Sequence, residues 1–95
     1  MTNDALGSDI STVITTPEAA TLHHGDVLIL DSDGWICLFL GTAELLEELR
    51  TARYDLVSEV HPKGEYVLIE TADGREFTCH REAEVAVRRR IPDAG

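Results

Sequence analysis

Basic residues are missing from the first half of this 95-residue chain, because no Lys or Arg precedes Arg50. Residues 1–49 carry nine acids, while residues 50–95 carry nine acids and eight bases, so most of the formal net charge of −10 lies in the first half. A half-domain of one charge sign acts on solubility, partner choice and association rate. It argues against direct nucleic-acid binding, since nucleic acids are polyanions. The only basic run, residues 88–90, would split across two faces of a strand.

Long apolar runs are also missing from the sequence, and no targeting segment is expected. The longest apolar run, residues 35–40, is six residues long, which is too short to cross a bilayer. The N-terminus has neither a positively charged start nor an apolar stretch, so no secretory signal is expected. We therefore expect a cytoplasmic protein without membrane attachment.

Cysteine is scarce, and the spacing of metal-binding residue types is unfavourable. Cys37 and Cys79 are the only two cysteines, and we expect both to be reduced and buried. No Cys-x-x-Cys or His-x-x-x-His occurs, so no metal site is expected from the residues His23, His24, Cys37, His61, Cys79 and His80. A calcium loop at residues 31–34 is excluded, because Ile29 and Leu40 stand where acidic ligands are needed.

The chain length predicts one domain, over residues 10–91, with flexible termini at residues 1–9 and 92–95. The first element is a strand over residues 10–16, which is rich in Thr, Val and Ile. One helical turn follows it, anchored in the core by Leu22.

The central segment predicts a hairpin that is apolar on both faces. Residues 27–30 and 35–40 are β-rich, and the turn between them ends in Asp-Gly. Such a hairpin must be covered on both sides. We therefore expect Trp35 and Phe39 to be mostly hidden, either in the monomer or in a dimer.

The next segment predicts a helix over residues 43–53, with Thr42 as its N-cap. Leu45, Leu46 and Leu49 form an apolar stripe, which is expected to cover one face of the hairpin.

The remaining residues are typical of strands. A strand is predicted at residues 56–60, a hairpin with one wetter face at residues 65–80, and a last strand at residues 84–91. Residues 67–74 match residues 27–34 at five of eight positions. Hairpins commonly combine an apolar strand with an Asp-Gly turn, so we attribute this similarity to convergence and not to an internal duplication.

These elements predict an α+β fold: a small, strongly bent antiparallel sheet or SH3-like barrel of five to six strands, with one packed helix. The alternative is an open sheet whose uncovered apolar face forms a homodimer.

The charge pattern predicts a non-catalytic acidic interaction module that docks on a basic protein surface, as an inhibitor or adaptor of a nucleic-acid-binding protein. This size and charge also fit phage accessory proteins. The alternative is a small-ligand-binding or regulatory β-barrel with an apolar pocket near Trp35 and Tyr66. No nucleophile–base pair is present, so neither an enzyme nor a cofactor is expected. The partner-binding residues expected are Asp31, Asp33, Glu44, Glu47 and Glu48.

Overall fold

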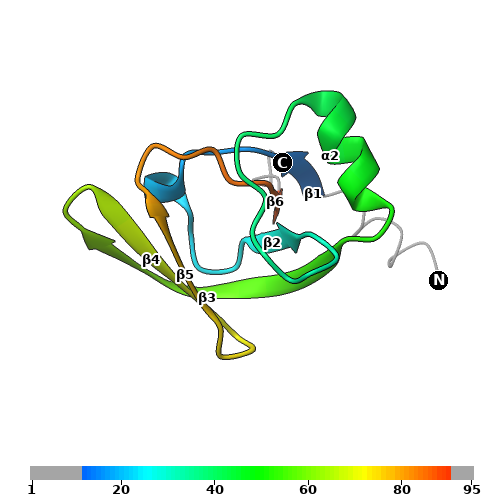
Figure 1. Cartoon of the computed structure of the whole chain (residues 1–95). Coiled ribbons are helices and arrows are strands. Elements are labelled where there is room, and N and C mark those ends of the chain that lie inside the picture. The colour runs from blue at the N-terminus through cyan, green and yellow to red at the C-terminus, as the bar shows by residue number, and fades with distance from the viewer. Residues whose placement is uncertain (1–11, 91–95) are drawn as a thin grey trace, which may run out of the picture.

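The computed structural model describes residues 12–90 and shows one antiparallel sheet with one α-helix (Figure 1). The ends of the chain expected to be flexible, residues 1–9 and 92–95, lie outside the described residues. The elements in chain order are β1 (Thr12–Thr15), the 3₁₀ turn η1 (Ala19–Thr21), β2 (Val27–Leu30), α2 (Thr42–Leu49), β3 (Arg53–Lys63), β4 (Tyr66–Thr71), β5 (Glu76–His80) and β6 (Val87–Arg90).

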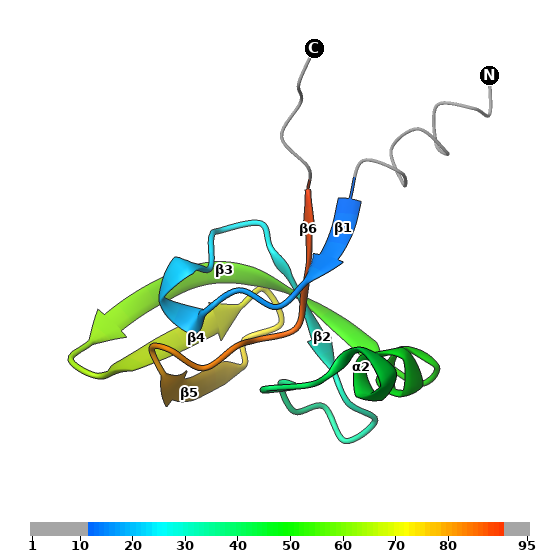
Figure 2. The ribbon, with the colours of Figure 1, turned by 90° about the horizontal axis from the view of Figure 1, so that it is seen from above.

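The strands follow the order β1-β6-β2-β3-β4-β5, and every neighbouring pair is antiparallel. The edge strands β1 and β5 are not joined by a ladder within residues 12–90, so the sheet stays open. The α+β prediction with a small antiparallel sheet is therefore confirmed, in its open form rather than as a closed barrel. Seen from above, α2 lies beside β2, away from the β4–β5 hairpin (Figure 2).

The longest strand, β3, belongs to both halves of the sheet. Its first residues, 53–56, pair with β2, and the rest pair with β4. Between these two ladders the register shifts, because Val57 faces Thr71 while Glu59 faces Glu70. Ser58 is the extra residue of this β-bulge, and its hydroxyl donates to the Glu70 carbonyl at 3.1 Å. A bulge of this kind bends the strand and changes where the following side chains point.

The main core lies on one face of the bent sheet. Ile69, Val57 and Val85 are completely buried there, and burying each such side chain contributes about 1.5–3 kcal/mol. The buried members of this core are Ala19, Leu22, Leu28, Leu30, Val57, Val67, Ile69, Phe77, Cys79, Ala83, Val85 and Val87.

A second, smaller cluster lies on the other face of β2. Ile29, Cys37 and Ala86 are buried in it, and Leu45 and Leu49 of α2 pack against it. This confirms that α2 covers one face of the central segment. The prediction is wrong for Leu46, which is 61% exposed. The helix also ends at Leu49, short of the predicted residue 53.

The largest correction concerns residues 35–40, which do not form a strand. Only two isolated bridges occur, between Leu30 and Ile36 and between Leu38 and Val85. Phe39 adopts a positive φ of 56°, which is incompatible with a regular strand. In this single chain Trp35 is 63% and Phe39 is 65% exposed, so the expectation that the monomer hides them is wrong.

Other predictions are confirmed. The strand at β1, the turn η1 with buried Leu22, the β4–β5 hairpin and the last strand β6 are all present. The two similar sequences end in similar turns, because Gly34 donates to the Asp31 carbonyl at 2.9 Å and Gly74 to the Thr71 carbonyl at 3.0 Å. Among the described residues, no helix is long and apolar enough to cross a membrane.

Candidate functional site

Three of the expected partner-binding acids lie on α2. Glu44, Glu47 and Glu48 are spaced three and four residues apart, so they share one face of the helix. Glu44 and Glu47 are exposed, and Glu48 is half-buried. The helix therefore presents a negatively charged stripe beside the leucines that pack on the core.

The remaining two expected acids, Asp31 and Asp33, lie in the turn after β2. Asp31 and Glu48 of the helix both affect the thiol of Cys37. Burial, together with the nearby charges of Glu48 and Asp31, raises the pKa of the Cys37 thiol to about 11. Both carboxylates therefore act on the same sulfur atom, one from the helix and one from the turn. Asp33, in the same turn, is exposed. Asp31 and Glu48 thus lie near the same thiol, and we call the segment that carries all five acids the acidic region (residues 31–49).

Some of these carboxylates also stabilise the local fold. Asp31 Oδ1 accepts hydrogen bonds from the backbone N–H of Asp33 at 2.8 Å and of Trp35 at 3.0 Å. Glu44 Oε1 accepts one from the Gly41 N–H at 2.8 Å, at the start of α2. Glu47 forms an exposed ion pair with Arg50 at 3.5 Å. Asp33 and Glu48 have no such structural contact among the described residues.

The acidic region contains two exposed aromatic side chains that the sequence predicted to be hidden. The Trp35 ring packs edge-on against Phe77 of β5, with centroids 6.0 Å apart. It helps to line an open pocket of about 330 Å³ with Asp33, Gly34, Arg75, Glu76 and Phe77. Arg75 closes one side of it by donating from Nη1 to the Gly34 carbonyl at 2.9 Å.

Trp35 and Tyr66, the residues expected to line a ligand pocket together, are not brought together. The Tyr66 ring packs against His80, with centroids 5.9 Å apart. His80 is exposed and Phe77 is buried on the same strand, so they point to opposite faces of β5. Trp35 and Tyr66 therefore contact opposite faces of the hairpin.

The cysteines are free and buried, as expected. Burial raises the pKa of both thiols. A thiol held in its neutral form is a poor nucleophile.

An ion pair links the acidic half of the chain to the last strand, β6. Arg89 of β6 donates from Nε to Asp26 Oδ1 at 3.0 Å and from Nη2 to Oδ2 at 2.8 Å. Asp26 Oδ2 also accepts the His23 backbone N–H at 2.8 Å. Burial tends to raise the pKa of Asp26, but the hydrogen bonds from Arg89 and His23 outweigh it and hold that pKa below its ordinary value.

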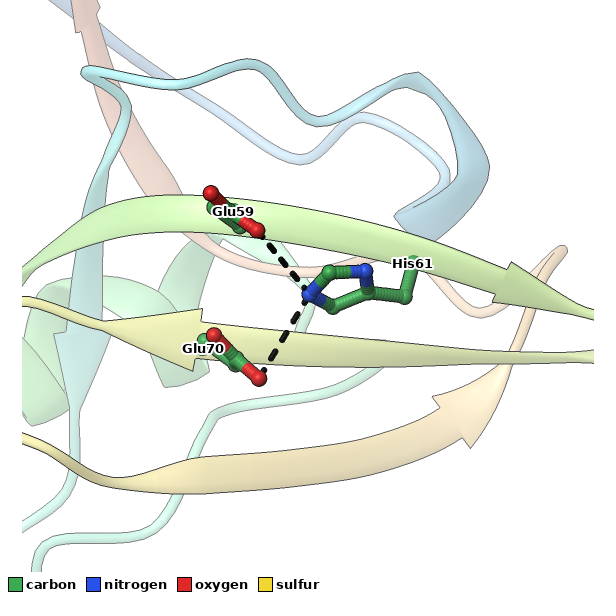
Figure 3. Close-up of side chains that lie close together, drawn as sticks. All are labelled: Glu59, His61 and Glu70. Carbon is green, nitrogen blue, oxygen red and sulfur yellow. Dashed lines mark ion pairs between the residues drawn. The ribbon is translucent and has the colours of Figure 1, made fainter.

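A second cluster of polar residues, which the sequence analysis did not predict, lies on the β3–β4 ladder (Figure 3). His61 Nε2 lies 3.2 Å from Glu59 Oε1 and 3.4 Å from Glu70 Oε2. Glu59 and Glu70 are direct cross-strand partners. The one available signal was the Glu-x-His spacing of residues 59 and 61, which places both side chains on one face of a strand.

No protein-family model, no curated protein and no solved structure matches this chain.

Proposed function

We propose that this protein is a non-catalytic, cytoplasmic interaction module that docks through its acidic region on an electropositive surface of a partner protein. The observation that carries the proposal is the exposure of Trp35 and Phe39 within a segment rich in carboxylates. Aromatic side chains supply much of the binding energy at protein interfaces, and a charged rim sets the choice of partner.

The backbone at Phe39 supports this reading. A bulky residue with a positive φ is conformationally unfavourable, and such strain is concentrated at binding sites. The Phe39 N–H donates to the Glu84 carbonyl at 2.9 Å, which holds the strained residue in place. The ring gains little from burial in this chain, because it is 65% exposed. Its conformation is better explained if a partner covers it.

The chemistry of the partner follows from the charge. Carboxylates on α2 and in the adjoining turn favour a surface rich in Lys and Arg, and such surfaces are typical of nucleic-acid-binding proteins. A role as inhibitor or adaptor of such a protein, of the kind found among phage accessory proteins, fits this chemistry. The two free cysteines suit a reducing compartment such as the cytoplasm.

The test compares two charge reversals of equal size. Asp33→Lys, Glu47→Lys and Glu48→Lys are combined in one variant, which leaves the capping carboxylates of Asp31 and Glu44 intact. Glu65→Lys, Asp73→Lys and Glu82→Lys, all at exposed positions outside residues 31–49, form the control. Each chain is immobilised and used to capture proteins from the cells that produce it, at low and at high salt.

We expect the first variant to lose the salt-sensitive partner and the control to retain it, because electrostatic attraction between exposed groups is screened by salt. A Trp35→Ala variant should weaken the same capture at both salt concentrations, since its contribution is apolar. If both charge-reversal variants capture the partner equally, the acidic region serves solubility only.

A small-ligand-binding or regulatory role remains as a second candidate, favoured by the pocket of about 330 Å³ beside Trp35. Its volume lies at the lower end of the range for small-molecule sites. Binding there would change the fluorescence of Trp35, the only tryptophan of the chain. A homodimer is a third arrangement: Tyr54 and Leu56 of β3 are 49% and 41% exposed on the face of the sheet away from the main core.

A further inference from the structure

The cluster of Glu59, His61 and Glu70 exists because of the β-bulge in β3. Without an extra residue, strict alternation would place Glu59 and His61 on the same face as buried Val57. Ser58 shifts the alternation by one position, so Val60 packs against the core while Glu59 and His61 lie on the opposite face. Figure 3 shows the side chains of Glu59, His61 and Glu70 gathered over the β3–β4 ladder. Bulges commonly redirect side chains at functional sites.

The distances within the cluster match those between ligands of a metal ion. Zn²⁺ binds imidazole nitrogen and carboxylate oxygen at about 2.0–2.2 Å, so two donors of a tetrahedral site lie about 3.4 Å apart. His61 Nε2 lies 3.2 Å from the Glu59 oxygen and 3.4 Å from the Glu70 oxygen. The ligand atoms of all three residues lie within 4.8 Å of one another. The distances from His61 to each of the two glutamates thus already match those of a tetrahedral site. A small rotation of one glutamate side chain would bring the oxygens of Glu59 and Glu70 to the same spacing from each other.

The charges around the cluster also favour a cation. Glu70 pairs directly with Glu59 on one side and with Glu76 on the other, so three carboxylates form a row across three adjacent strands. Like charges placed directly opposite each other destabilise a sheet. Among the described residues, His61 is the only potentially cationic side chain within 4.0 Å of Glu59 or Glu70. A divalent cation would neutralise more of this charge than one imidazole can.

We propose that Glu59, His61 and Glu70 bind one divalent transition-metal ion of the Zn²⁺ type. The imidazole ligand favours Zn²⁺ and its neighbours over Ca²⁺ and Mg²⁺, which prefer oxygen ligands. Three protein ligands on one exposed face leave a coordination position for water or for a donor atom from another molecule. Because the ligands come from β3 and β4, the ion ties together the two strands of the ladder beyond the bulge.

The test is titration of the metal-free full chain with ZnCl₂, followed by calorimetry and by the NMR signals of the histidine rings. The variants His61→Asn and Glu70→Gln each remove one ligand. His80→Asn is the matched control, because His80 lies on the same sheet near a single carboxylate, with Nε2 3.8 Å from Glu65 Oε1. Glu59→Gln, at the most exposed ligand, gives a further variant with little risk to folding.

We expect the parent chain to bind one Zn²⁺ ion, with the His61 signals shifting first and the midpoint of thermal unfolding rising with metal concentration. His61→Asn, Glu70→Gln and Glu59→Gln should each weaken binding by about tenfold or more, and His80→Asn should not. The proposal is refuted if the parent chain does not bind Zn²⁺, or if its affinity is the same in the His61 and His80 variants. In either case the cluster is only a polar contact between one imidazole and two carboxylates.

Discussion

Replacing Arg89 by Met tests how the acidic half is held to the rest of the sheet. The guanidinium makes two hydrogen bonds to Asp26 and a third, from Nη2, to the Thr21 carbonyl at 3.2 Å. The Asp26 side chain is only 5% exposed, whereas that of Arg89 is 26% exposed. Met keeps the apolar stem of Arg, so the substitution removes the charge and its hydrogen bonds while retaining most of the packing.

The loss of stability in Arg89→Met depends on the group that remains buried without a partner, which is the Asp26 carboxylate. Removing one partner of a fully buried ion pair costs about 3–5 kcal/mol. Because Arg89 is partly exposed, water reaches this site, and we expect about 2–3 kcal/mol for Arg89→Met. The reverse change, Asp26→Asn, leaves a guanidinium that can turn toward water, and should cost about 1 kcal/mol. The specific prediction is that Arg89→Met lowers the free energy of unfolding more than Asp26→Asn does.

The pH dependence gives an independent check. The pKa of Asp26 is lowered in the folded chain, so the pair stabilises the fold above the ordinary value of 3.8, and this stabilisation is lost as the pH falls through the lower folded value. In Arg89→Met the hydrogen bond from His23 still lowers the pKa of Asp26, but burial, the strongest influence on this carboxyl, should outweigh it and raise the pKa. The folded variant then takes up a proton more readily, so the difference between parent and variant should shrink as the pH falls from neutral toward 4.

Urea unfolding of the parent and both variants, at neutral pH and near pH 4, measures these differences. At about 4–8 °C per kcal/mol for a domain of this size, Arg89→Met should also lower the thermal midpoint by roughly 10–20 °C. Equal losses for the two variants, or a difference that does not change with pH, would refute the reasoning.

Substitutions at Gly34 and at Phe39, each compared with a matched control, test the turn and the loop. Gly34 and Gly74 have φ of 89° and 87°, so Ala at either position should cost about 1–2 kcal/mol. Gly34→Ala should cost about 1 kcal/mol more, because its Cβ would lie 2.5 Å from Arg75 Nη1, and the extra cost should vanish in an Arg75→Ala background. Phe39→Ala should cost less than about 1 kcal/mol, against about 3–5 kcal/mol for Phe77→Ala, which is 5% exposed. Phe39→Gly should be no less stable than Phe39→Ala, since Gly tolerates the positive φ; denaturant unfolding measures all of these changes.

The sequence predicted those elements whose pattern agrees with their surroundings. The β4–β5 hairpin alternates cleanly, and Leu45 and Leu49 pack as the helical spacing predicts. Residues 35–40 were read as a strand because they are all apolar, and periodicity alone does not show whether a partner strand exists. Here β3 pairs with all of β2 on one side, and β6 pairs with Val27 and Leu28 on the other, so residues 35–40 form only one bridge to β2, from Ile36 to Leu30. The segment is therefore left as a loop.

The candidate sites also differ in whether local sequence spacing predicts them. The acids of α2 follow from helical spacing, so their common face was predictable. The contact of Arg89 with Asp26 joins residues that are 63 positions apart in the sequence, so no local sequence pattern predicts it. The Glu59–His61–Glu70 cluster depends on the one-residue shift at Ser58, and simple alternation predicts the opposite face for two of its three members.

The position of β3 has a consequence for how the protein unfolds. Because one continuous strand supplies hydrogen-bond partners to β2 at one end and to β4 at the other, neither half of the sheet is complete without it. Main-core residues from the two ends, such as Leu28 and Ile69, also belong to one apolar cluster. Separating the halves would leave backbone groups of β3 unpaired and the cluster open to water. The sheet is therefore one cooperative unit, and opening of the β3–β4 ladder is coupled to the stability of the end that carries α2.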